Sequence, residues 1–174
     1  MARLRKFVAY RSLERPYTRK SKYRTKNFVR AFPHNVIVRY VMGDPNGTFP
    51  ILYRIRAKVG CQVRSNALES ARQVAVKYLE TTTGKTGFMF RLRKFPHHIL
   101  RENALASGAG ADRLSTGMKQ SFGKPIGIAA QVHVGDIIFE VATNKEADAK
   151  KACELIKCKL PNSWSIVNES PVVA

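Results

Sequence analysis

The sequence has no long apolar segment and few cysteines. None of its apolar runs is long enough to cross a membrane, and the start MARLRKFVAYRS has no apolar core of signal-peptide length. The three cysteines, Cys61, Cys153 and Cys158, are odd in number and form no CxxC pair, which supports neither a disulfide framework nor a zinc site. We therefore predict a soluble intracellular protein in which the cysteines are small buried hydrophobic residues.

Motifs of catalysis and nucleotide binding are also missing. Gly84, Lys85 and Thr86 resemble the end of a P-loop, but Leu79 stands where the motif requires glycine, and the segment follows a predicted helix. Residues 117–124 have five rather than four residues between their glycines. The pair His97 and His98 has no HExxH spacing and is predicted to lie in a loop touching backbone or RNA, and no serine lies in a GxSxG elbow. We predict no enzyme, no cofactor and no metal site.

Acidic residues are scarce, with 12 Asp and Glu against 31 Lys and Arg and a formal charge of +19. Residues 1–30 carry eleven basic residues and one acidic residue, and residues 31–101 carry twelve and three. Residues 102–174 carry eight of each. Such an excess of positive charge exceeds what solubility requires and indicates a polyanionic partner.

Residues 1–30 are predicted to be an extended arm that binds RNA. Five aromatic residues, from Phe7 to Phe28, alternate irregularly with Arg and Lys. Aromatic rings can stack on bases while guanidinium groups bind phosphates, although a solvated tail is the alternative. The residues assigned to RNA binding here are Arg3, Arg5, Lys6, Arg11, Arg15, Tyr17, Arg19, Lys20, Lys22, Arg24, Lys26 and Arg30.

Residues 31–174 are predicted to form one α+β domain, a two-layer sandwich in which a mainly antiparallel sheet carries two helices on one face. Strands are expected at 35–42, 51–59, 88–95, 98–101, 126–134, 137–143 and 164–167, with helices near 65–81 and 144–160. Residues 43–47 are expected to turn between the first two strands, and Gly135 and Asp136 to close a hairpin. Glu140 is expected at an outward strand position.

The strand expected at 51–59 alternates basic and apolar residues, so the sheet is predicted to present a cationic face to RNA. Such a face binds the RNA backbone and shape, with little reading of base sequence. The residues assigned to it are Arg54, Arg56, Lys58, Arg91, Arg93 and Lys94.

Residues 102–125 form a connection rich in Gly, Ser and Ala that is longer than the ~15 residues usual in compact domains, which indicates a functional loop. Its glycines allow tight turns and close backbone approach to a partner. The residues assigned to this loop and its entry are Arg101, Asn103, Gly108, Gly110, Asp112, Arg113, Gly117, Lys119, Gly123 and Lys124.

Residues 108–125, GAGADRLSTGMKQSFGKP, resemble the hallmark of the universal large-subunit ribosomal protein family called L-sixteen in bacteria and L-ten-e in archaea. Further matching segments are 17–20, 41–43, 67–72 and 130–135, and the resemblance extends over nearly the whole chain. It favours the archaeal and eukaryotic branch, and the short segment after Val167 favours an archaeal source. Ala104 and Leu105 depart from the family, in which a Lys-Met pair is expected, so the resemblance does not support a phosphate contact at the first turn of the loop.

The resemblance implies an α/β sandwich at the base of the central protuberance of the large ribosomal subunit. It implies contacts with large-subunit rRNA, the 5S rRNA neighbourhood and neighbouring ribosomal proteins, with the loop near the peptidyl-transferase centre and the A- and P-site tRNAs. The implied role is structural, in translation and late subunit assembly in the cytoplasm, with no membrane and no small-molecule substrate. The alternatives are a free RNA-binding or assembly factor, which a high-salt wash would release from the subunit, and an RNA-modifying enzyme, which would need a cofactor pocket.

Overall fold

The structure is a computed structural model that describes residues 5–14, 29, 32–103, 108–110 and 123–169. Its elements in chain order are the 3-10 helix η1 (Phe7–Tyr10), β1 (Val41–Gly43), β2 (Ile51–Ala57), β3 (Cys61–Arg64), α1 (Ser65–Thr83), β4 (Phe88–Leu92), β5 (His98–Glu102), β6 (Lys124–Val132), β7 (Ile137–Thr143), α3 (Glu146–Lys159) and β8 (Trp164–Asn168). The predicted α+β class is confirmed.

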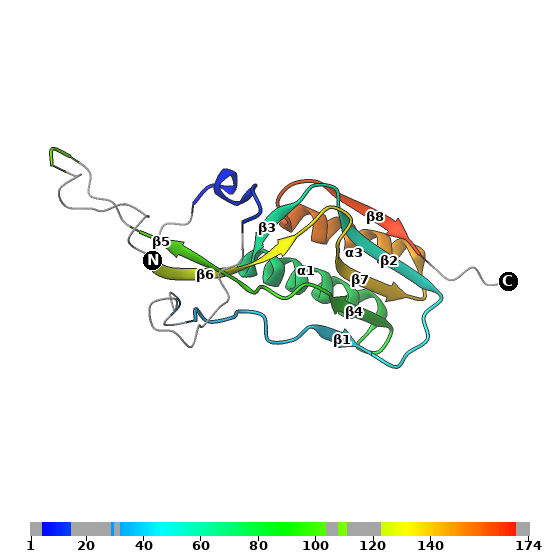
Figure 1. The fold of residues 1–174 in the computed structure, drawn as a ribbon. Helices are drawn as coiled ribbons and strands as arrows, with labels where there is room; N and C mark the ends of the chain where they lie inside the picture. Colours follow the sequence, from blue (N-terminus) through cyan, green and yellow to red (C-terminus); the bar gives the residue numbers. More distant parts are fainter. Residues whose placement is uncertain (1–4, 15–28, 30–31, 104–107, 111–122, 170–174) are drawn as a thin grey trace.

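The strands form two sheets, where the sequence predicted a mainly antiparallel sheet without this division (Figure 1). The larger sheet has the order β1-β4-β7-β2-β8, and the smaller sheet has the order β3-β6-β5. All pairings among the described strands are antiparallel. The short strand β3 was not predicted, because four residues are too few to show a clear alternation.

Helices α1 and α3 lie side by side on one face of the five-stranded sheet, as predicted (Figure 1). Each helix buries residues spaced three or four apart, including Leu68 and Leu79 of α1 and Ile156 of α3. They pack against sheet residues such as Phe90 and Phe139, whose ring centroids are 5.4 Å apart. Full burial of each large apolar side chain contributes about 1.5–3 kcal/mol, so this layer holds the domain together.

The predicted hairpin of the strands at 126–134 and 137–143 is wrong. Strand β6 pairs with β3 and β5, whereas β7 lies between β4 and β2 in the other sheet. The chain does turn at Gly135, with φ of 83°, but the turn is held by β2: the Gly135 N–H donates to the Ala57 carbonyl and the Ala57 N–H donates to the Asp136 carbonyl, both at 2.9 Å. A turn sequence shows where the chain reverses, and it does not show which strands then pair.

The first predicted strand is shorter than expected and has a different neighbour. Only Val41–Gly43 form a strand, and it pairs with β4, so residues 43–47 do not close a hairpin with β2. Within that connection the Asn46 N–H donates to the Asp44 carboxylate at 3.0 Å, a local bond that stabilises the turn itself.

Two of the three cysteines, Cys61 and Cys153, are buried as predicted, and Cys158 is exposed. Burial raises the pKa of the Cys153 thiol to about 12, so this group behaves as a small apolar residue. No group of three potential metal ligands occurs among the residues that the structure describes. Neither α1 nor α3, the two long helices in the described part of the chain, is long and apolar enough to span a bilayer.

Candidate nucleic-acid interface

The five-stranded sheet carries a row of charged residues on the face that points away from the helices. Arg91 on β4, Glu140 on β7 and Arg54 on β2 are direct cross-strand partners, and residues paired in this way share one face. The neighbouring Tyr53 points the other way, because its hydroxyl donates to Glu146 of α3 at 2.7 Å. The row therefore lies on the side of the sheet opposite the helices.

Arg56 and Arg93 extend this row. Each lies two residues after another arginine, Arg54 or Arg91, and residues two apart in an extended segment share one face. In the sheet, Arg56 pairs with Ser165 of β8, and the Arg93 N–H continues the ladder by donating to the Ile138 carbonyl at 2.7 Å. We call Arg54, Arg56, Arg91 and Arg93 the arginine face. All four were predicted from the sequence to bind RNA.

Two carboxylates lie among these arginines. Their ion pairs with the arginines were not predicted from the sequence. Glu140 is buried, although it lies on the face predicted as outward, and its Oε1 lies 2.9 Å from Arg54 Nε and 3.7 Å from Arg93 Nε. Glu169, just after β8, forms ion pairs with Arg54 and Arg56. A lone glutamate in the apolar strand IIFEVAT was the available signal, because a buried charge requires a partner.

Four arginines against two glutamates leave two positive charges in excess on this face. Partly exposed ion pairs contribute only about 0–1 kcal/mol each to stability, because water screens them. Glu140 differs, because a buried carboxylate that loses its cations costs about 3–5 kcal/mol. The arrangement keeps the guanidinium groups at the surface and the central carboxylate beneath them.

Lys58 and Lys94 lie at the end of the sheet where Gly135 turns. Lys58 is exposed, whereas the Lys94 ammonium group lies 2.6 Å from the Asp136 carboxylate. Burial raises the pKa of Asp136, but the hydrogen bonds from Lys94 and from the His133 N–H outweigh it and hold that pKa below its usual value. Lys94 is thus matched by an ionised carboxylate, and Lys58 extends the cationic surface.

The beginning of the predicted arm packs on the three-stranded sheet. Two buried glutamines, Gln62 and Gln131, donate to the main-chain carbonyls of Ser12 and Glu14, each at 2.7 Å. Tyr10 is buried, with the Arg64 guanidinium 5.3 Å from its ring centroid. Residues 5–14 are therefore folded against the domain, whereas the sequence predicted an extended arm.

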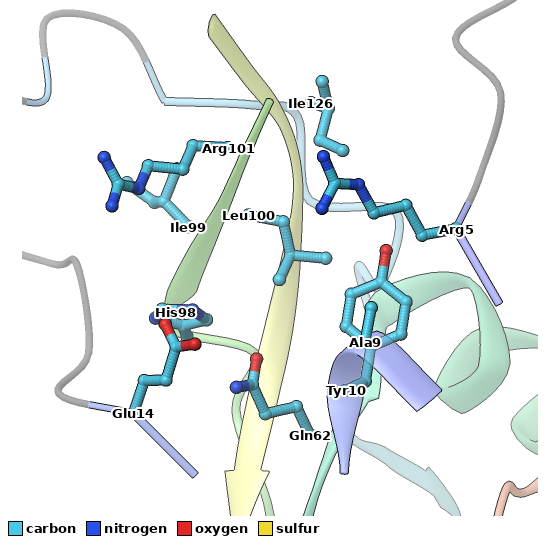
Figure 2. A pocket seen from close by; sticks show the side chains of 10 residues that line it. All are labelled: Arg5, Ala9, Tyr10, Glu14, Gln62, His98, Ile99, Leu100, Arg101 and Ile126. Carbon is cyan, nitrogen blue, oxygen red and sulfur yellow. The ribbon is translucent and has the colours of Figure 1, made fainter. Parts of the chain in front are cut away.

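A cavity of about 170 Å³ lies between this segment and the three-stranded sheet, lined by residues that include Arg5, Tyr10, Gln62 and Arg101 (Figure 2). Figure 2 shows the Glu14 carboxylate directed toward His98. Burial lowers the pKa of His98, and the nearby Glu14 charge opposes that shift. His98 is buried and begins β5, in agreement with the strand expected at 98–101 and not with the loop position given to the histidine pair.

The other assigned arm residues divide into exposed cations and positions that the structure does not describe. Arg5, Lys6 and Arg11 are exposed, and Arg11 lies 5.9 Å from the Phe7 ring centroid. They form a cationic surface beside the three-stranded sheet. Outside the described residues lie Arg3, Arg15, Tyr17, Arg19, Lys20, Lys22, Arg24, Lys26 and Arg30.

The first and last parts of the segment predicted as a loop belong to strands β5 and β6. Glu102 and Lys124 are cross-strand partners at the end of β5 and β6, so both belong to the stem and not to the loop. Gly123 has φ of 81°, and a Cβ atom there would lie 2.6 Å from the Glu102 carbonyl oxygen, so the stem requires glycine. Of the assigned residues, the structure describes Arg101, Asn103, Gly108, Gly110, Gly123 and Lys124, while Asp112, Arg113, Gly117 and Lys119 lie outside it.

Comparisons with known proteins identify the relatives of this chain. The family model described as ribosomal protein L16p/L10e matches residues 14–167. A large ribosomal subunit protein uL16 of Methanococcus maripaludis is 44% identical over 94% of this chain and 93% of its own length. The protein of the same name from Archaeoglobus fulgidus is 42% identical over 92% and 90%, and that of Hyperthermus butylicus 43% identical over 84% and 79%.

Proposed function

The chain belongs to the ribosomal protein L16p/L10e family, and from this premise we propose that it binds large-subunit rRNA through its arginine face and its N-terminal segment. As a family member it is a structural protein of the large ribosomal subunit in the cytoplasm, and the family is not a class of enzymes. Its partners are rRNA and other ribosomal proteins. We propose in addition which surfaces of the chain bind rRNA.

The arginine face is the single observation that carries the assignment to RNA. Its guanidinium groups come from β2 and from β4 with the residue just after it, lie on the face that no described helix covers, and retain a positive excess after pairing with Glu140 and Glu169. Guanidinium groups bind phosphate oxygens through two parallel hydrogen bonds. A rigid sheet that presents several of them suits an RNA backbone of fixed shape, and it reads little base sequence.

The segment between Glu102 and Lys124 has a separate part in the proposal. We place it near the peptidyl-transferase centre and the A- and P-site tRNAs, with the 5S rRNA neighbourhood close to the domain. Support comes from the rigid stem, in which two paired strands and the close approach at Gly123 fix where the loop leaves the domain. The domain thereby supplies placement, and the loop supplies contacts at the tRNA site and in late subunit maturation.

Binding of an in-vitro transcript of archaeal large-subunit rRNA at several salt concentrations tests the role of the arginine face. The double variant R91A/R93A removes two arginines of that face, and K77A/K85A removes the same charge from exposed positions on and just after α1. We expect R91A/R93A to weaken binding and to reduce the slope of log K against log salt by about 1.4 to 1.8, because each phosphate contact contributes ~0.7–0.9. Equal effects of the two double variants would show that net charge alone drives binding.

A further inference from the structure

We propose that Glu140 is a positioning residue for RNA: it fixes the guanidinium groups of Arg54 and Arg93 so that both can bind an RNA phosphate. The inference rests on the proposed function of the arginine face and assigns that face a central phosphate site. Glu140 itself contacts no RNA in this account. It acts through the two arginines on either side of it.

The geometry around Glu140 supports this role. Glu140 lies on β7, the middle strand of the five, and its carboxylate faces the Nε atoms of Arg54 and Arg93 from adjacent strands. Its side chain is 4% exposed, whereas those of Arg54 and Arg93 are 28% and 47% exposed. An approaching anion therefore meets guanidinium groups before it meets the carboxylate.

The atoms used in these contacts leave binding capacity on the arginines. Glu140 contacts Arg93 at the Nε atom of the arginine. The same planar guanidinium group carries further N–H donors on its two Nη atoms. A phosphate can accept two parallel hydrogen bonds from such a group. Fixing an arginine in the folded protein also removes part of the entropy cost that binding would otherwise carry.

Glu169 provides an internal comparison, because it contacts the same Arg54 in a different way. Its carboxylate lies against Nη1 of Arg54 and Nη2 of Arg56, the kind of atom that a phosphate would use. It is more exposed than Glu140, at 22%, and it follows the last strand. Glu169 therefore competes with phosphate for these donors, whereas Glu140 supports them from beneath.

The two glutamates consequently give opposite predictions for the same loss of charge. Each Glu→Gln change adds one positive charge to the protein, and simple electrostatics would strengthen RNA binding in both cases. We expect E140Q to bind the large-subunit rRNA transcript about three- to tenfold more weakly than the wild type, because the ion pairs that hold the guanidinium groups of Arg54 and Arg93 over Glu140 are lost. E169Q should bind more tightly.

Two further variants separate positioning from charge and from folding. E140D keeps the charge but shortens the side chain, so it should also weaken binding, and it decides the question if E140Q fails to fold. E154Q makes the same charge change at an exposed position of α3, where Glu154 lies 3.7 Å from Lys151, and should stay within about twofold of the wild type. Thermal unfolding of each variant checks the fold.

Equal or tighter binding by folded E140Q, or unchanged binding by E140D, would overturn the inference, since Glu140 would then be only a counter-charge. In the R54A/R93A background E140Q should restore stability, because it removes a buried carboxylate that has lost its cations, and it should cause no further loss of binding. A further loss of binding would show that Glu140 acts through the fold. The proposed function fails by a different result, namely R91A/R93A binding like the wild type. If R91A/R93A loses RNA binding as expected and E140Q loses none, the positioning role of Glu140 is refuted and the proposed function stands.

Discussion

Gly43 ends β1 in a left-handed conformation, with φ of 80°, directly beside the Phe88 carbonyl group of β4. A Cβ atom at this position would overlap the Phe88 carbonyl oxygen, which also accepts a hydrogen bond from the Asp44 N–H at 3.0 Å. Only glycine satisfies both the conformation and the close approach. This position therefore lets the edge strand β1 pair with β4, the strand that carries Arg91.

We predict that G43A destabilises the domain by at least about 2 kcal/mol, because strain at positive φ adds to the overlap with Phe88. Gly84 provides a matched control, since its φ is 78° and a Cβ there would meet nothing within 4 Å. G84A should lose only the conformational part, about 1–3 kcal/mol, and G43A should lose more than G84A. Urea unfolding of both variants measures the difference, and equal losses would contradict the role given to the overlap.

At the level of single residues, the sequence predicted which side of a strand certain cations occupy, but it did not predict what surrounds them. The alternation from Ile51 to Ala57 is visible without a structure, so Arg54 and Arg56 could be assigned to one face. Their contacts with Glu140 and Glu169 depend on cross-strand register and on a partner 115 residues away from Arg54 in the sequence. No local pattern contains that information.

At the scale of elements, periodicity predicted both long helices and most strands, because each buries an apolar stripe that repeats along the chain. Pairing was harder to predict. Strands β6 and β7 are each flanked by other strands, and both are apolar enough to be central, so their sequences fit a hairpin as well as two separate sheets. The docking of residues 5–14 depended on Gln62 and Gln131, which show no pattern in the sequence.

The loop and the domain should be separable elements. Replacing residues 104–122 by a short Gly-Ser connection while keeping Gly123 should preserve the fold, because loop closure changes by only ~0.6 kcal/mol per doubling of length. We expect modestly weakened assembly into the large subunit. Peptide-bond formation or late maturation should fail, since the contacts proposed for the tRNA site are removed. Thermal unfolding, subunit occupancy and peptide formation on purified ribosomes measure the three effects.

The single changes R113A and K119A are smaller versions of this experiment, and each should give a weaker defect of the same kind. Normal peptide formation by fully occupied ribosomes that lack the loop would show that it is dispensable. Loss of occupancy alone would show that it is an anchor. Either result would contradict the division between placement by the domain and function by the loop.

At the scale of the whole molecule, the charge distribution and the fold both favour the proposed RNA-binding face. The first 101 residues contain all of the net positive charge, and they include three of the strands of the five-stranded sheet and the N-terminal segment. The second half of the chain supplies Glu140 and Glu169, which match part of that charge at the sheet surface. We therefore assign the polyanion to the face of the five-stranded sheet that lies opposite α1 and α3.

Sedimentation of ribosomes after a high-salt wash tests the central claim most directly. The wild-type chain should remain with the large subunit, because a structural constituent is held by many contacts to folded rRNA, whereas R91A/R93A should be partly released and K77A/K85A should remain. Recovery of the wild-type chain in the free fraction, with the subunit and its rRNA intact, would contradict the account and identify a transiently bound factor.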